Sequence, residues 1–334
     1  MINLLRKGIG EFVCSEISAN YDWDRVVSLA AEQYVLPIVY DAVVGSNELR
    51  GALPLSIKTQ VYGSVRSAEQ RYEKHCRVLE KLASFYASHG IKMMVLKGIG
   101  LSALYPVPNH RQCGDIDIYL YGEQKRAVDR SHHHHTVFTI DGVMIENHYD
   151  FVNVWAHSSS GDIERELKEL ASSEHSETMK MGEAYIYTMP PTLGLIFLLR
   201  HTAQHFAAHH VELRQLVDWY LFIKHNDALI DWDRVRRVAE RAGMGEFLVI
   251  WNRLSRWLVT GEGELSKTDK RVLDDMLHPA YRGHGPKSGW LRIWLFKWKR
   301  WWANRWKNRL VYSKESLFTQ VWWLLRSHAV TPDV

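Results

Sequence analysis

Two aspartates on one predicted strand offer the clearest chemistry in this chain of 334 residues. Asp115 and Asp117 alternate with two isoleucines, so both carboxylates point to the same face of the strand, about 7 Å apart. Two carboxylates that face together repel each other unless a cation neutralises them, and hard divalent ions prefer oxygen ligands. Aspartate is also disfavoured in strands. We therefore predict a divalent-metal site here rather than a solvated strand end.

A hairpin predicted further along the chain supplies a third carboxylate. Residues 136–140 and 143–148 are alternating runs joined by Asp141-Gly142, a strong signal for a two-residue turn. The register that this turn sets places Glu146 and His148 on one face. Glu146 is the candidate third metal ligand, and His148 is a candidate phosphate contact. The alternative is that Glu146 is an exposed polar residue on a two-faced sheet.

The segment before the aspartates has features of a phosphate-binding turn. An apolar run, 93–96, ends in Lys97-Gly98, and a short helix is predicted to follow. Gly98 and Gly100 would let the backbone approach a phosphate at the start of that helix, where free amides and the helix dipole favour anions. Lys97 and Arg111 could bind the same phosphate, although surface charge is the more common role of such residues.

These motifs together resemble a known family. The string L-K-G-x-x-L-x-x-L-Y-P-x-P-x-x-R-x-x-G-D-I-D at 96–117 is similar to the signature of bacterial proteins described as uncharacterised nucleotidyltransferases. Those proteins are distant relatives of the polymerase-beta-type superfamily. The resemblance implies a glycine-containing strand-to-helix turn for a triphosphate, a paired aspartate for Mg²⁺ and a third carboxylate on a later strand.

The activity that the resemblance implies is transfer of a nucleoside monophosphate from an NTP to a hydroxyl group. Two Mg²⁺ ions held by Asp115, Asp117 and Glu146 would serve this reaction. The acceptor stays open between a sugar or glycan precursor, a small molecule and an RNA end. A non-catalytic descendant that only binds is one alternative. A glycosyltransferase that holds a sugar nucleotide through D-x-D is another, but it would need a larger parallel sheet.

The expected fold class is α+β and predominantly helical, with a small mixed β-sheet as the nucleotidyltransferase core. Residues 1–90 are predicted to form an N-terminal helical region, 91–157 the core and 162–334 a C-terminal helical domain. Helices are predicted at 57–89, 99–105, 162–170, 192–220, 232–242, 246–259, 266–277, 288–310 and 315–328, and strands at 91–96 and 115–120.

Two local features qualify this outline. The pentapeptide D-W-D-R-V begins at Asp22 and again at Asp231, which indicates two similarly capped helices rather than a repeat. The connection from Tyr121 to His135 is tight for a crossover between strands. Either its helix is short or the chain lacks a segment near 126–129.

Histidines cluster at two places outside the predicted metal site. His132 to His135 lead into a strand, where alternation splits them between two faces, so we expect a partly exposed strand start rather than a metal site. His201, His205 and His209 recur every four residues on one helix face without the glutamate of a zinc-protease motif. We expect a polar stripe that faces the core or the cleft. The following segment, with Arg214 and Asp218, resembles the helical portion after the catalytic domain in the family.

Composition places the protein among soluble, globular ones, with 46% hydrophobic and 24% charged residues. The widely spaced Cys14, Cys76 and Cys113 fit a reducing cytoplasm, and Cys113 is interpreted as a buried filler rather than a nucleophile. The longest apolar runs, such as 195–199, are far shorter than the roughly 20 residues of a membrane span. We expect a cytoplasmic protein without a transmembrane span, or one peripheral to a membrane.

A basic, tryptophan-rich segment at 282–314 stands apart from the rest. It carries ten lysines and arginines, and no acidic residue lies between Asp275 and Glu315. On a helical wheel its six tryptophans share one half, with most basic groups opposite. Such a helix at Trp290 to Leu310 fits an anionic membrane surface or a nucleic acid. A helix docked on the core, with a solvated basic back, is the alternative.

Overall fold

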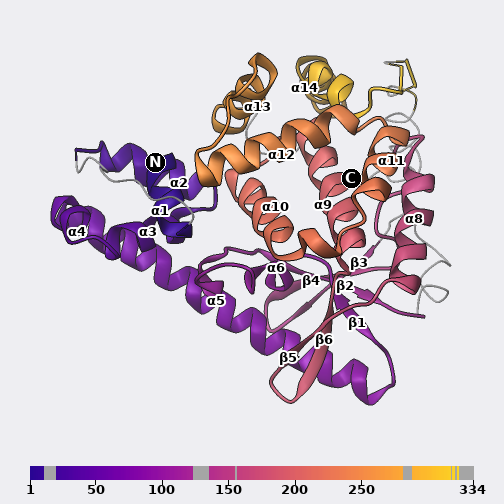
Figure 1. Ribbon diagram of the computed structural model, residues 1–334, viewed down its shortest axis with the longest axis horizontal. Coiled ribbons are helices and arrows are strands. Elements are labelled where there is room, and N and C mark those ends of the chain that lie inside the picture. The colour runs from indigo at the N-terminus through magenta and orange to yellow at the C-terminus, as the bar shows by residue number, and fades with distance from the viewer. Residues whose placement is uncertain are drawn as a thin grey trace.

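The computed structural model in Figure 1 places a mixed β-sheet at one end of the molecule and layers of helices above it. Two strands, β1 and β2, form the centre of the sheet. One hairpin extends the sheet beyond β2, and a second hairpin extends it beyond β1. The strands are β1 (Met93–Val95), β2 (Asp115–Leu120), β3 (His135–Ile140), β4 (Val143–His148), β5 (Thr178–Met181) and β6 (Ala184–Thr188). The structure describes residues 1–10, 20–122, 135–154, 156–280, 288–316, 318, 319 and 322, and the backbone alone at 290 and 291.

Helices precede, interrupt and follow the strands. Before the sheet come α1 (Ile2–Ile9), α2 (Trp23–Glu32), α3 (Leu36–Val44), α4 (Asn47–Ala52) and the long α5 (Leu55–Ser88). Between β1 and β2 lie α6 (Ile99–Ser102) and the 3₁₀ turn η1 (Pro108–His110). After β4 come α8 (Ser160–Ser173), α9 (Pro191–Ala208), α10 (Leu213–Asn226), η2 (Asp227–Leu229), α11 (Trp232–Arg241), α12 (Gly245–Thr260), α13 (Lys267–Leu277) and α14 (Trp290–Val311).

The strand order is β3-β4-β2-β1-β6-β5. The pairs β2–β4 and β1–β6 are parallel, and the other three pairs are antiparallel. The predicted hairpin register is confirmed, with Ile140 opposite Val143 and His135 opposite His148. This small mixed sheet among many helices confirms the α+β class and does not fit the larger parallel sheet that a glycosyltransferase would need.

The two faces of the sheet have different partners. The side chains of β1, β2 and β4 that point to one face, Ile116 and Ile118 among them, are buried against Leu79 and Leu82 of α5. On the opposite face Tyr119 stacks on Phe151, with ring centroids 4.3 Å apart, in the core that also contains α9. Because side chains alternate along a strand, Asp115 and Asp117 lie on the face toward α9.

The N-terminal helices share a core with the C-terminal helices. Arg6 of α1 donates from Nε to the carbonyl of Leu258, at 2.9 Å, and from Nη2 to that of Trp257, at 2.7 Å. Buried residues of α1 to α3 and of α9 to α13 belong to a single apolar cluster. The division of the chain into three regions stays a prediction, and the structure shows that the outer two are packed together.

Two helix starts and one helix end follow local capping rules. The side chain of Asp22 accepts from the amide of Arg25 at 3.1 Å, and that of Asp231 accepts from the amide of Arg234 at 2.8 Å. The two copies of D-W-D-R-V are therefore similarly capped helices, as predicted. Gly90, two residues after α5, has φ +70°, which favours glycine.

Two sequence predictions need correction, and two strands are additional to those predicted. Strands β5 and β6 were not predicted, because their short runs acquire strand geometry only by pairing with each other and with β1. The predicted helix 192–220 is two helices, since the chain leaves helical geometry at His209. Helix α6 ends at Ser102 rather than at 105. Cys14, the segment 126–129, His132 to His134 and most of the predicted helix 315–328 lie outside the described residues.

Candidate active site

Three carboxylates from two neighbouring strands converge on the face of the sheet toward α9. Asp115 and Asp117 lie two residues apart on β2, and the parallel pairing with β4 places Glu146 directly beside Asp117. One oxygen from each of the three lies within 4.8 Å of the others. The structure thus brings the predicted acidic trio together, and the role of these residues as metal ligands stays a prediction.

Two cationic side chains contact this trio. Lys97 Nζ lies 3.2 Å from Asp117 Oδ1 and 4.0 Å from Asp115 Oδ2. His148 Nε2 lies 3.2 Å from the same Asp117 oxygen and 3.6 Å from Glu146 Oε2. Lys97 comes from the turn after β1, and His148 ends β4, so two β-segments and a loop build the site.

Burial and charge act against each other in this cluster. Burial would raise the pKa of Asp117, whose side chain is fully buried, but Lys97 and His148 outweigh it and hold that pKa well below its usual range. Burial would lower the pKa of His148, but hydrogen bonds to Asp117 and Glu146 raise it to about 9. For Asp115, burial and then the Asp117 charge raise the pKa. Lys97 and His148 are thus both cationic at neutral pH.

The site has the donor set and a free position for a divalent cation. Asp117 Oδ2 is buried and has no hydrogen-bond partner among the described residues, so one carboxylate oxygen is available to a cation. Lys97 and His148 supply two positive charges against three carboxylates. Hard oxygen ligands of this kind suit Mg²⁺, and the residues therefore fit the ion that the family implies.

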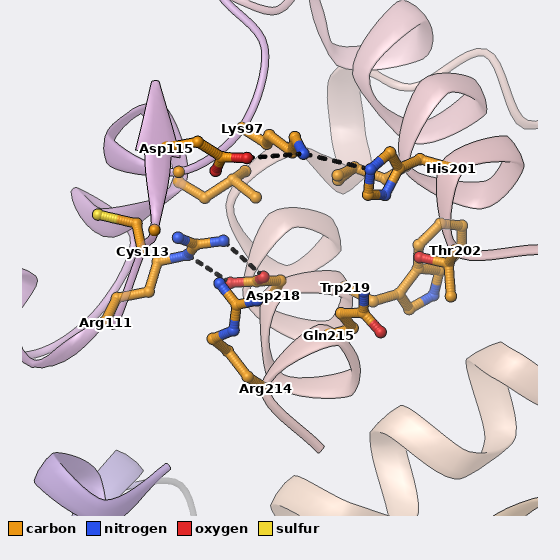
Figure 2. Close-up of a pocket in the computed structure, with 14 residues that line it drawn as sticks. Lys97, Arg111, Cys113, Asp115, His201, Thr202, Arg214, Gln215, Asp218 and Trp219 are labelled. Carbon is orange, nitrogen blue, oxygen red and sulfur yellow. Dashed lines mark hydrogen bonds and ion pairs between the residues drawn. The ribbon is translucent and has the colours of Figure 1, made fainter. Parts of the chain in front are cut away.

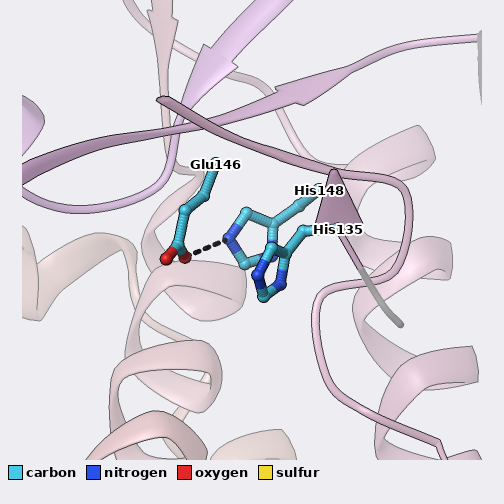
Figure 3. A group of neighbouring side chains, drawn as sticks. All are labelled: His135, Glu146 and His148. Atoms are coloured by element: carbon cyan, nitrogen blue, oxygen red, sulfur yellow. Dashed lines mark ion pairs between the residues drawn. The ribbon is translucent and has the colours of Figure 1, made fainter. Parts of the chain in front are cut away.

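A second group of possible ligands adjoins the trio. His135, Glu146 and His148 also bring their ligand atoms within 4.8 Å of one another. Figure 3 shows His135 of β3 beside His148, with Glu146 directed toward the same imidazole. The ring centroids of the two histidines are 5.0 Å apart. His135 therefore reaches the face of the sheet that carries the acidic trio.

A cavity opens beside the carboxylates, between the β1–β2 connection and helices α9 and α10. Its volume is about 80 Å³, and Figure 2 shows Lys97 and Asp115 on one side and His201 on the other. Arg111 and Arg214 also line it. Typical ligand pockets measure roughly 300–1,000 Å³. A cavity of this size can hold a phosphate-sized group, and the rest of a nucleotide would lie outside it.

The predicted phosphate-binding glycines occupy different environments. Gly98, which lines the cavity, has φ +59°, and a Cβ there would lie 3.4 Å from the carbonyl oxygen of Asp115. Gly100 is turned toward β1, where a Cβ would lie 3.3 Å from the carbonyl oxygen of Val95. Gly98 therefore provides the backbone turn beside the aspartates, and Gly100 provides close packing.

Arg111 is held by an internal ion pair. Its Nε and Nη2 donate to the two oxygens of Asp218 on α10, at 2.7 and 2.8 Å, and Tyr105 donates to the same carboxylate at 2.6 Å. Figure 2 shows this pair among the residues that line the cavity. Arg111 Nη1 has no hydrogen-bond partner among the described residues. A phosphate contact by Arg111 stays a prediction, and Nη1 is the atom that could make it.

Helix α9 completes the site with two histidines. Lys97 donates to His201 Nε2 at 3.3 Å, and the ring of His205 lies 4.4 Å from that of His201. Burial, followed by the charge of Lys97, lowers the pKa of the His201 ring. The stripe predicted from spacing thus faces the cleft at His201, which lines the cavity, and His205 is an exposed residue beside it. His209 instead ends α9, where it accepts from Arg300 at 3.0 Å.

The fold and the site together define a nucleotidyltransferase-like protein, with an acidic trio beside a glycine turn on a small mixed sheet. A family model described as "Uncharacterised nucleotidyltransferase" matches residues 19–260. The chain belongs to this family, which confirms the family predicted from residues 96–117.

Other comparisons add little to this assignment. No curated protein matches the chain. An antigenic nucleotidyltransferase-like protein from Paracoccidioides brasiliensis matches 45% of this chain and 75% of its own, with 12% identity and a TM-score of 0.31. No helix in the described part of the chain is long and apolar enough to cross a lipid bilayer.

Proposed function

We propose that the protein is a Mg²⁺-dependent nucleotidyltransferase that transfers a nucleoside monophosphate from an NTP to a hydroxyl acceptor. The observation that carries the proposal is the acidic trio. Its three carboxylates approach within 4.8 Å, and one buried oxygen of Asp117 lacks a partner among the described residues. Membership of a nucleotidyltransferase family supports the reaction class.

In this reaction the acceptor oxygen forms a bond to the α-phosphorus, the bond from the α-phosphorus to the bridging oxygen breaks, and pyrophosphate leaves. The acceptor hydroxyl loses its proton to solvent. Asp115, Asp117 and Glu146 would hold divalent ions, which lower the pKa of a bound hydroxyl and neutralise developing charge.

The chain's own cations contribute to the same electrostatics. Lys97 is held between Asp117 and His201, so its ammonium group stays beside the carboxylates without rearrangement. His148, cationic at neutral pH, fixes the orientation of Asp117 through its hydrogen bond. Such preorganised charge stabilises a transition state more than mobile charge in water does. Gly98 and the cavity beside Asp115 would take part of the triphosphate.

The direct test is label transfer from a panel of α-labelled NTPs in the presence of Mg²⁺ and candidate acceptors. Asp117→Asn and Glu146→Gln should each reduce transfer by about 100-fold or more, because each removes a ligand charge. Glu183→Gln is the matched control, since Glu183 is an exposed carboxylate at the β5–β6 turn. Equal labelling by the wild type and by Asp117→Asn would refute the proposal.

One observation supports a second candidate, a nucleotide-binding descendant that does not catalyse transfer. Lys97 already neutralises Asp117 at 3.2 Å, so the carboxylates have a cation of their own. This candidate predicts calorimetric binding of an NTP without label transfer to any acceptor. Transfer that depends on Asp117 would eliminate it.

A further inference from the structure

Helix α14 carries an exposed ridge of tryptophans. Trp294, Trp298 and Trp302 recur every fourth residue and are 44%, 37% and 53% exposed. Leu295 beside them is 41% exposed. Monomeric soluble proteins rarely present several large apolar side chains side by side without a partner. We call these four residues the tryptophan ridge.

The opposite face and the C-terminal end of α14 are fixed to the body. Lys307 is 1% exposed, lies 2.5 Å from Asp275 Oδ2 and donates to the carbonyl of His209 at 3.0 Å. Asn304 and Val311 are also buried. Trp306 also faces the body, where its ring centroid lies 5.7 Å from that of Phe206. One face of α14 is therefore docked on the core, as the alternative expected, whereas the ridge is exposed.

Basic side chains border the ridge. Arg305 and Arg309 continue its line along the helix, and the guanidinium of Arg305 lies 4.8 Å from the centre of the Trp302 ring. Arg292 and Lys299 are exposed beside it. The segment from 276 to 314 contains no acidic residue, so no carboxylate of its own offsets this charge. The ridge thus combines apolar surface with unbalanced positive charge.

We infer that the tryptophan ridge docks on the surface of an anionic phospholipid bilayer. Indole rings settle at the boundary between headgroups and acyl chains, and lysine or arginine beside them binds phosphate headgroups. A helix that lies in the interface needs this arrangement of one apolar stripe with basic borders. The inference does not depend on nucleotidyl transfer.

Two other occupants fit the ridge less well. A single-stranded nucleic acid would stack its bases on open indole faces. Here the rings of Trp294 and Trp298 stack with an interplanar angle of 6° and centroids 5.9 Å apart. Trp298 and Trp302 stack with an angle of 22° and centroids 6.5 Å apart. A second copy of the chain would bring two positively charged borders together, which costs free energy.

The position of α14 leaves the active site accessible in the docked state. Figure 1 shows α14 at the end of the molecule opposite the sheet, with α9 and α12 between them. Helix α14 packs on α9, the helix that carries His201. The docked protein would therefore present the acidic trio away from the bilayer, toward a dissolved or membrane-borne substrate.

The test is sedimentation of the full chain with vesicles of phosphatidylcholine, alone or mixed with phosphatidylglycerol. We expect binding to the anionic vesicles that weakens as salt rises. The variant Trp294→Ala/Trp298→Ala/Trp302→Ala should lower the partition coefficient at least about tenfold. The charge variant Arg292→Glu/Lys299→Glu should lower it to a similar degree.

Controls separate docking from damage to the fold. Tyr62→Ala removes an exposed aromatic on α5, 60% exposed, and should leave vesicle binding unchanged. The charge variant keeps all the indoles, so it tests the inference even if the triple variant fails to fold. Equal sedimentation with neutral and anionic vesicles, or none with either, would overturn the inference. So would unchanged vesicle binding by the charge variant, or a ridge that instead binds single-stranded DNA or forms a dimer by light scattering.

Discussion

At the scale of single residues, Lys97 links the acidic trio to helix α9. Its ammonium group lies between the aspartate pair and His201, in a position where it neutralises buried charge. A buried carboxylate that loses its cationic partner costs the fold several kcal/mol, because the charge then stays desolvated. A lysine in this place can therefore serve both stability and catalysis.

The variant Lys97→Met separates these roles. Without Mg²⁺ its free energy of unfolding should fall by about 3–5 kcal/mol, because Asp117 keeps only His148 as a cationic partner. Its melting temperature should fall accordingly. Mg²⁺ should raise the melting temperature more in this variant than in the wild type, since a divalent ion can then neutralise the trio. Differential scanning fluorimetry measures both effects, and Lys92→Met is the control. A Mg²⁺ response no larger than that of the wild type would contradict a metal site here.

The ion pair of Arg111 and Asp218 gives a second prediction. Arg111→Met leaves Asp218 buried with only Tyr105 as a donor, and should cost about 3–5 kcal/mol in urea denaturation. The double variant Arg111→Met/Asp218→Leu removes both charges and should be more stable than Arg111→Met alone. If the double variant is instead the less stable of the two, the pair is not the source of the effect.

At the scale of elements, α8 contains a carboxyl group with an unusual environment. Glu164 is buried, and its Oε2 accepts from the amide of Val152 at 2.9 Å. Burial and then the charge of Asp150 raise its pKa to about 7, and the opposite effect of the Lys168 charge, which lowers the pKa, is smaller. A folded-state pKa above the unfolded value means that this group stabilises the fold at low pH and loses that contribution as pH rises through 7.

Glu164→Gln tests this linkage. Glutamine imitates the protonated form at every pH, so the melting temperature of the variant relative to the wild type should rise between pH 5 and pH 8. The change should correspond to on the order of 1 kcal/mol or more. Glu183→Gln serves as the exposed control and should show no such trend. A difference that is constant with pH would show that Glu164 titrates normally.

At the scale of the whole molecule, one apolar core joins the N-terminal and C-terminal helices. Helix α1 contacts α12 through Arg6, and the sheet lies between α5 and the helices that follow it. Elements so connected are expected to unfold together. The three regions predicted from the sequence then behave as parts of one cooperative unit.

Denaturation followed by two probes checks this cooperativity. Circular dichroism reports the helices, and the reactivity of the Cys113 thiol, which is buried beside the sheet, reports the core under α5. Both should give the same midpoint. Arg6→Met should lower that midpoint for both probes together, because it removes two hydrogen bonds between α1 and α12, one of them buried. Thiol exposure at a lower denaturant concentration would show that the sheet region opens on its own.

Local rules predicted much of the element pattern. The two capping aspartates, Asp22 and Asp231, mark helix starts, and Asp141-Gly142 sets the hairpin register that places Glu146 beside Asp117. The predicted role of Cys113 as a buried filler also agrees with the structure, where its thiol lies 3.3 Å from His75 Nδ1 and burial raises its pKa. These features depend on neighbours in the chain or across one turn.

The amino-acid sequence alone determined the family, the acidic strand and the third carboxylate, because alternation and turn chemistry act over a few residues. The tertiary structure decided that β5 and β6 join the sheet, that His201 holds Lys97 and that Asp218 holds Arg111. It also decided that Trp294, Trp298 and Trp302 of α14 are exposed. Each of these depends on segments far apart in the chain meeting in one core. Which side chain becomes buried, and beside which charge, is settled only when the helices pack.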